Sequence, residues 1–160
     1  MNLAAKLGNT LKSPWLALVF RLYIGGLFAY ASIYKINFPA EFAETIASYQ
    51  IVPYFGVNLM AVVLPWIELM SGVMLIIGVR VRAAALILTA LLAVFTLAIA
   101  ITLVRGVPIG CGCFHTIEDP ISWKTLVRDL IWLAMAVHVC LYDRVLRLEG
   151  RYRLRIKGIE

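Results

Sequence analysis

Four stretches of the chain are almost continuously apolar, and each is long enough to cross a membrane as a helix. A crossing helix needs roughly 20 mostly apolar residues, because each residue rises about 1.5 Å through a hydrocarbon layer about 30 Å thick. None of the four stretches alternates between polar and apolar positions, as a β-barrel strand would. The pattern therefore predicts an all-α fold, a four-helix transmembrane bundle with spans at about residues 15–34, 58–78, 83–104 and 123–142.

The overall composition also indicates a membrane protein. Of the 160 residues, 62% are hydrophobic and 15% are charged, and the mean hydropathy is +0.90. A soluble domain has about 45–50% apolar and about 25% charged residues. The excess argues against a disordered chain, a disulfide-stapled secreted module and, despite the net charge of +6, a nucleic-acid-binding protein. We predict a single domain over residues 1–160, with the first span retained rather than cleaved as a signal peptide.

The basic residues predict how the spans are oriented. They collect before the first span, in the turn at Arg80 and Arg82, and in a tail over residues 143–160. Short cytoplasmic loops are enriched in lysine and arginine, so we expect a multi-pass protein of the inner (cytoplasmic) membrane with both termini in the cytoplasm. Binding of anionic lipid headgroups is the alternative explanation for the basic tail. The loops at about 35–56 and 105–122 then face the periplasm or the exterior.

The first outward loop contains a short helical pattern. Phe42, Ile46 and Tyr49 recur at the i, i+4 and i+7 positions that share one face of a helix. This spacing predicts a short amphipathic helix that lies on the membrane surface.

The second outward loop contains the candidate chemistry. Cys111 and Cys113 are separated only by Gly112 and are followed by His115. Disulfides persist in the oxidising compartment outside the membrane, and a disulfide across one intervening residue closes a small, strained ring. Because strain makes such a bond easier to reduce, we predict a pair that takes part in thiol–disulfide exchange.

The same motif has two alternative interpretations. One is a static structural disulfide. The other is a metal site formed with His115 and completed by Glu118 or Asp119, although zinc sites more often have two to four residues between the cysteines, so no metal is expected. The third cysteine, Cys140, lies near the opposite end of the fourth span and is expected to be a small buried apolar residue.

Ionisable residues inside the spans form a second candidate site. Such groups cost at least roughly 2.5–3.5 kcal/mol in the hydrocarbon, so they normally face protein or water and have a partner. Helical rise places Glu68 and Arg128 at similar depths in the outer half of the membrane. We predict a cluster of Glu68 with Arg128 or Lys35 beneath the cysteine loop, which either fixes helix packing or assists proton movement. A positive charge from His115 or Arg128 would also lower the pKa of a nearby thiol.

Three other polar residues within or next to the spans carry weaker expectations. Asp129 lies 100° around the helix from Arg128, so we expect it to face the loop or a water-filled gap rather than share the face of Arg128. Arg21 is expected to extend to the cytoplasmic surface, and His138 to be a satisfied residue at a helix end.

Aromatic residues near the outer ends of the spans are candidates to line a quinone pocket. Amphipathic rings also form belts at membrane interfaces, which explains these residues equally well. The candidates are Tyr30, Tyr34, Trp66 and Trp123.

Three segments of the chain follow the pattern of a known family. The first runs from Arg21 through Gly25, Gly26 and Phe28 to Lys35, and the second contains Glu68, Gly72, Gly78 and Arg82. The third is Cys111-Gly112-Cys113-Phe114, with Trp123 and Arg128-Asp129 after it. Over nearly its whole length the chain resembles the MauE/DoxX family of four-span membrane proteins, in its MauE-like branch. The family usually has glycine after the phenylalanine, where this sequence has His115.

The resemblance implies a redox role. MauE is associated with maturation of methylamine dehydrogenase, whose small subunit is rich in disulfides, and DoxX relatives with quinone-coupled oxidation of sulfur or thiols. We therefore predict a quinone-linked thiol–disulfide oxidoreductase that exchanges electrons between a periplasmic partner protein and the membrane quinone pool. The alternatives are a non-catalytic accessory subunit of a larger respiratory or maturation complex and, more weakly, metal binding by Cys111, Cys113 and His115.

Overall fold

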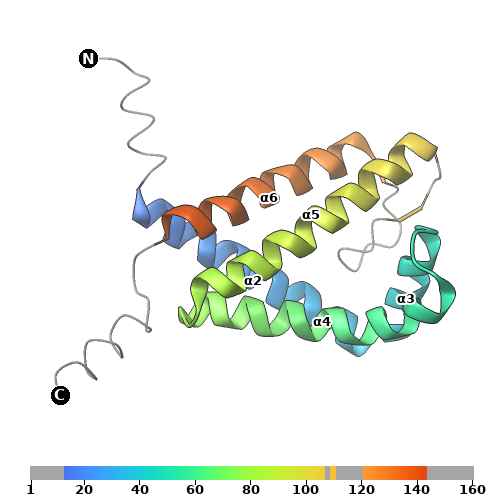
Figure 1. Ribbon diagram of the computed structural model, residues 1–160, viewed down its shortest axis with the longest axis horizontal. Coiled ribbons are helices and arrows are strands. Elements are labelled where there is room, and N and C mark those ends of the chain that lie inside the picture. Colours follow the sequence, from blue (N-terminus) through green and yellow to red (C-terminus); the bar gives the residue numbers. More distant parts are fainter. Residues whose placement is uncertain (1–12, 107–108, 111–120, 144–160) are drawn as a thin grey trace.

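The computed structural model describes residues 13–106, 109–110 and 121–143, and that part of the chain folds into five helices (Figure 1). The four long ones are each long and apolar enough to cross a membrane, which confirms the predicted all-α fold with four spans. They are α2 (Pro14–Asn37), α4 (Tyr54–Ile77), α5 (Val81–Arg105) and α6 (Trp123–Tyr142), and the short helix α3 (Pro39–Ser48) lies between α2 and α4.

The helices form a bundle with two different ends. The start of α2, the end of α6 and the turn between α4 and α5 lie at one end, and α3 lies at the other (Figure 1). The turn follows Gly78, whose left-handed backbone (φ 86°) ends α4, and only glycine adopts that conformation without a steric cost. That the end with this turn is cytoplasmic stays a prediction.

A close helix contact joins α2 to α4 and depends on two glycines. A Cβ atom on Gly25 would lie 2.9 Å from the carbonyl oxygen of Gly72, and a Cβ on Gly72 would lie 2.8 Å from the carbonyl oxygen of Gly25. Neither position has room for a methyl group. The two backbones therefore pack directly against each other, as small residues allow in membrane helices.

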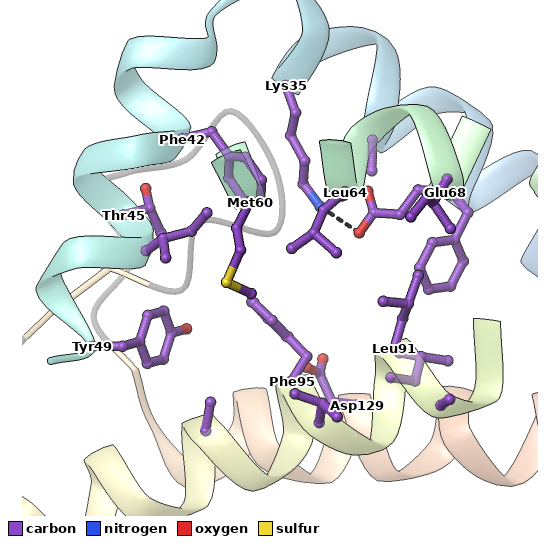
Figure 2. Close-up of a pocket in the computed structure, with 18 of the residues that line it drawn as sticks. Lys35, Phe42, Thr45, Tyr49, Met60, Leu64, Glu68, Leu91, Phe95 and Asp129 are labelled. Carbon is purple, nitrogen blue, oxygen red and sulfur yellow. Dashed lines mark hydrogen bonds and ion pairs between the residues drawn. The ribbon is translucent and has the colours of Figure 1, made fainter. Parts of the chain in front are cut away.

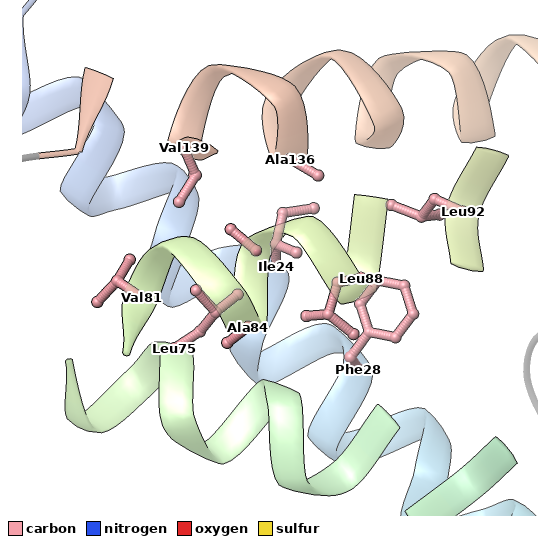
Figure 3. Close-up of a cluster of buried hydrophobic side chains, with 10 residues drawn as sticks. Ile24, Phe28, Leu75, Val81, Ala84, Leu88, Leu92, Ala136 and Val139 are labelled. Carbon is pink, nitrogen blue, oxygen red and sulfur yellow. The ribbon is translucent and has the colours of Figure 1, made fainter. Parts of the chain in front are cut away.

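A core of buried apolar side chains fills the bundle toward the α4–α5 turn. Residues from all four long helices contribute to it, and Ile24, Leu75 and Leu88 are fully buried. Around the outside, large apolar side chains such as Leu59, Val94 and Leu97 are more than half exposed, as expected for a surface that contacts lipid. Figure 3 shows the core residues Ile24, Phe28, Leu75, Val81, Ala84, Leu88, Leu92, Ala136 and Val139.

Helix α3 has the predicted amphipathic pattern but a different partner. Phe42, Ile46 and Tyr49 are all buried, and Phe42 and Ile46 pack against Val57 and Ala61 of α4. This face therefore packs on the protein, and the expectation that the helix lies on the membrane surface stays a prediction. This end of the bundle also has an apolar surface. A short turn joins α3 to α4 and keeps α3 close to that surface, so the apolar face of α3 packs on it.

Arg21 also differs from expectation. It is 2% exposed, and its Nη1 atom lies 3.1 Å from Oδ2 of Asp143, which is fully buried just beyond α6. The prediction that Arg21 extends to the cytoplasmic surface is wrong, because a carboxylate from the far end of the chain pairs with it inside the protein. This ion pair ties the start of α2 to the end of α6.

Candidate functional site

The residues that flank the predicted cysteine motif, Ile109 and Ile121, pack at the α3 end of the bundle. Cys111, Cys113 and His115 themselves, like Glu118 and Asp119, are outside the described residues. The residues flanking them are described, and the backbone N–H of Ile121 donates to the carbonyl oxygen of Ile109 over 2.9 Å. Ile109 and Ile121 pack in a cluster with Tyr49 and Ile99. The two ends of the cysteine segment are therefore joined, beside the end of α3.

A cavity of about 460 Å³ lies next to this cluster. All five helices contribute to its walls, which are mostly apolar, with Leu27 and Phe28 of α2, Leu64 of α4 and Phe95 of α5 among the lining residues. Figure 2 shows the side chains converging on it. Its polar lining residues are Lys35, Thr45, Tyr49, Glu68 and Asp129.

Lys35 and Glu68 form a buried ion pair on one wall of the cavity. The Nζ atom of Lys35 lies 3.0 Å from Oε1 and 2.8 Å from Oε2 of Glu68 (Figure 2). The residues are 7% and 8% exposed, and the ammonium also lies 4.8 Å from the centre of the Phe42 ring. Of the two partners predicted for Glu68, the structure therefore has Lys35.

Arg128 instead pairs with its neighbour in sequence. Its Nε atom donates to Oδ1 of Asp129 over 3.1 Å, and its guanidinium lies 4.6 Å from the centre of the Trp132 ring. The two residues are neighbours on the helix, and the long arginine side chain reaches across to Asp129. Asp129 does face a gap, since it lines the cavity.

Asp129 is the least satisfied polar residue of the cavity. It is 1% exposed, and its Oδ2 atom is buried and has no hydrogen-bond partner among the residues that the structure describes. Buried polar atoms in proteins are nearly always paired, and those that are not require an explanation.

Tyr49 brings a hydroxyl to the same cavity from the end of α3. Burial raises the pKa of this phenol above its usual value, the Asp129 carboxylate raises it further, and Arg128 opposes the shift. Tyr49 is therefore neutral at physiological pH and near enough to Asp129 to sense its charge.

The aromatic residues predicted to form a quinone pocket do not line this cavity. Tyr30, Trp66 and Trp123 are 71%, 50% and 69% exposed on the outside of the bundle, the positions expected for an aromatic belt. The hydroxyl of Tyr34 donates to Glu41 over 2.6 Å. Sequence reasoning missed the rings that do line the cavity, which are Phe28, Phe42, Tyr49, Phe95 and Trp132.

The remaining predicted residues lie near the other end of the bundle. Cys140 is a half-buried free thiol 3.6 Å from the hydroxyl of Thr89. The ring of His138 packs between Phe20 and Tyr142, but its Nε2 atom has no hydrogen-bond partner in the described part of the chain, so it is not the fully satisfied residue expected. No group of three metal-ligating side chains occurs among the described residues.

Comparison with known proteins gives one consistent family. The family model "Methylamine utilisation protein MauE" matches residues 13–142. A methylamine utilization protein MauE of Paracoccus denitrificans is 30% identical over 135 residues, which cover 83% of this chain and 73% of that protein. The protein of the same name from Paracoccus versutus is 35% identical over 131 residues, covering 81% and 70%. No solved structure matches at a comparable level of significance. The chain belongs to the MauE family of membrane proteins.

Proposed function

We propose that this protein serves methylamine utilisation as a membrane thiol–disulfide redox protein. In this proposal Cys111 and Cys113 exchange electrons with a periplasmic partner protein, and a membrane quinone is the other electron carrier. Membership of the MauE family supports the first part, since its relatives are named for methylamine utilization. The spacing of the two cysteines supports the second part.

The observation that carries the proposal is the position of Ile109 and Ile121, the described residues that flank the cysteine segment, relative to the cavity. The joined residues Ile109 and Ile121 pack with Tyr49, and Tyr49 also lines the cavity. The residues on either side of the cysteine segment therefore pack next to a largely apolar cavity whose walls come from all five helices. Such a cavity suits the ring of a lipid-soluble electron carrier.

The chemistry balances in two steps. A thiolate of the partner attacks one sulfur of the Cys111–Cys113 disulfide, which releases the other cysteine as a thiolate and forms a mixed disulfide. The second partner thiolate then attacks this mixed disulfide, forms a disulfide within the partner and releases the remaining cysteine as a thiolate. The partner has then lost two electrons and gained a disulfide, and both cysteines are reduced. Two electrons and two protons next pass from the cysteines to a membrane quinone, which leaves as a hydroquinone. The reverse sequence, with a hydroquinone as donor, reduces a disulfide in the partner.

The charged residues have supporting roles in this proposal. Arg128 holds Asp129 in place at the cavity wall, and Lys35 neutralises Glu68 inside the membrane-spanning part of the bundle. His115 follows the motif directly, and its positive form would raise the thiolate fraction of Cys113.

A non-catalytic subunit of a larger complex is the second candidate function. It is favoured by α6, which is the least covered of the four long helices. Val127, Ile131 and Leu141 on its outer face are 54%, 56% and 60% exposed. A helix of a partner protein could cover these side chains in place of lipid.

The test is to follow the redox state of the pair directly. A Cys140→Ser background leaves Cys111 and Cys113 as the only thiols, so an alkylating mass tag counts them alone. The proposal predicts two tags per chain after a reductant, none after a soluble quinone, and two again after a reduced periplasmic partner. A pair that stays in one state under all three treatments, or that holds a stoichiometric metal ion, contradicts it.

A further inference from the structure

We infer that the cavity binds the reduced, hydroquinone form of its ligand in preference to the quinone, through a hydrogen bond from a ring hydroxyl to Oδ2 of Asp129. The inference deepens the proposed function. It rests on that function in one respect, which is that the ligand is a hydroquinone rather than another apolar molecule with a hydroxyl group. The preference for a hydrogen-bond donor depends on the cavity alone.

The cavity has the dimensions and surface of a binding site for a small apolar molecule. Its volume of about 460 Å³ falls within the range of roughly 300–1,000 Å³ that is usual for ligand pockets. Its walls carry aromatic side chains on several sides, including Phe28, Phe42 and Phe95, and such walls suit an aromatic ring.

Nearly all polar groups of the lining already have partners within the chain. Lys35 and Glu68 bind each other, the hydroxyl of Thr45 donates to the carbonyl oxygen of Glu41 over 3.0 Å, and Tyr49 also has an interaction within the protein. Asp129 Oδ2 is different, since it is buried without a hydrogen-bond partner among the described residues. Asp129 lies across the cavity from the Lys35–Glu68 pair (Figure 2).

The available atom determines which ligand chemistry fits. Arg128 donates to Oδ1 of Asp129, and this charge-assisted hydrogen bond favours the ionised form of the carboxyl. An ionised carboxylate only accepts hydrogen bonds. A quinone carbonyl is also only an acceptor, so it gains nothing from Oδ2, whereas a hydroquinone hydroxyl donates to it. Binding the reduced form preferentially would favour the transfer of electrons from the cysteine pair to the quinone.

The test measures binding without the redox reaction. The full-length protein with Cys111→Ser and Cys113→Ser is placed in nanodiscs and titrated without oxygen with three probes. These are a short-chain ubiquinol, the corresponding ubiquinone, and the ubiquinol with both hydroxyls methylated. We expect the ubiquinol to bind at least about tenfold more tightly than the other two, as a hydrogen bond to a charged group predicts. Equal affinity for the ubiquinol and its methylated form would overturn the inference.

Three variants locate the site. Asp129→Asn replaces the acceptor by an amide that also donates, so the ubiquinol should lose about tenfold in affinity while the ubiquinone does not. Ala98→Phe fills the cavity that Ala98 lines and should abolish binding of all three probes. Ala93→Phe, on an exposed face of the same helix, is the matched control and should bind like the parent. Unchanged binding in Ala98→Phe would contradict the inference, and this pair decides the location even if Asp129→Asn fails to fold.

The outcomes also separate this inference from the proposed function. If the probes do not bind but the cysteine pair still responds to quinone, the cavity assignment fails and the redox proposal stands. If ubiquinol binds selectively but the cysteines never change state, the redox proposal fails and the site remains.

Discussion

The stability of the protein should depend on whether the buried Lys35–Glu68 pair keeps both of its charges. Replacing Lys35 by methionine leaves a carboxylate inside the bundle, and replacing Glu68 by glutamine leaves an ammonium there. Among the described residues, each single change removes the only opposite charge within 4.0 Å of the other group. The double variant removes both charges, so it should be more stable than either single variant.

The geometry sets the size of the effect. At 2.8 Å and an effective dielectric constant of about 20, the attraction between the two charges is about 6 kcal/mol. The cost of taking both groups out of water offsets part of this attraction. Breaking such a pair from one side typically costs about 3–5 kcal/mol, because the remaining charge is buried and uncompensated. Both residues are less than a tenth exposed, so solvent screens little of this cost.

The assay is a four-variant cycle of unfolding free energies. Protein in mixed micelles is titrated with a denaturing detergent, and helix content is followed by circular dichroism. We expect Lys35→Met and Glu68→Gln each to lose about 3–5 kcal/mol, with the double variant losing less than either one. Lys124→Met, at an exposed lysine near the start of α6, is the control and should change stability by less than about 0.5 kcal/mol. Losses that simply add in the double variant would refute the coupling.

Three further predictions test the packing around the site. Gly25→Ala should lower the thermal midpoint and cost about 1–3 kcal/mol, because its methyl group meets the backbone of α4, whereas Gly26→Ala, with open space around it, should not. Phe42→Ala should cost about 3–5 kcal/mol in the same detergent titration, against little for Phe55→Ala, which is 88% exposed. Because the pKa of Tyr49 is raised, the folded state holds this proton more tightly, so stability should fall above about pH 10 and Tyr49→Phe should reduce that fall.

The sequence predicts the spans well because membrane helices follow from local hydropathy. It also predicts Glu68 as a paired residue, since a lone carboxylate in hydrocarbon is too costly. The same reasoning does not say whether Lys35 or Arg128 is the partner of Glu68. Helical rise gives the depth of a residue along the bundle, but the partner depends on how each helix is rotated. Arg128 has the right depth and still pairs with Asp129.

The cavity and the buried Oδ2 atom of Asp129 on its wall were not predictable, because five helices form the walls. The face of Phe42, Ile46 and Tyr49 was identified, but an apolar helix face does not specify whether it covers lipid or protein. The packing of α3 against the bundle supplies one wall of the cavity. Asp143 was likewise missed as the partner of Arg21, since the two are distant in sequence and no local pattern relates them.

The central claim is that the cysteine pair passes electrons between protein thiols and a quinone, and one reconstituted reaction tests it most directly. Proteoliposomes containing the protein and a membrane quinone receive a reduced periplasmic thiol protein, while free thiols and quinone absorbance are recorded together. The account predicts that one quinone is reduced for every two thiols lost, and that Cys111→Ser stops both changes. Thiol loss without quinone reduction, or an unchanged rate in Cys111→Ser, would contradict it.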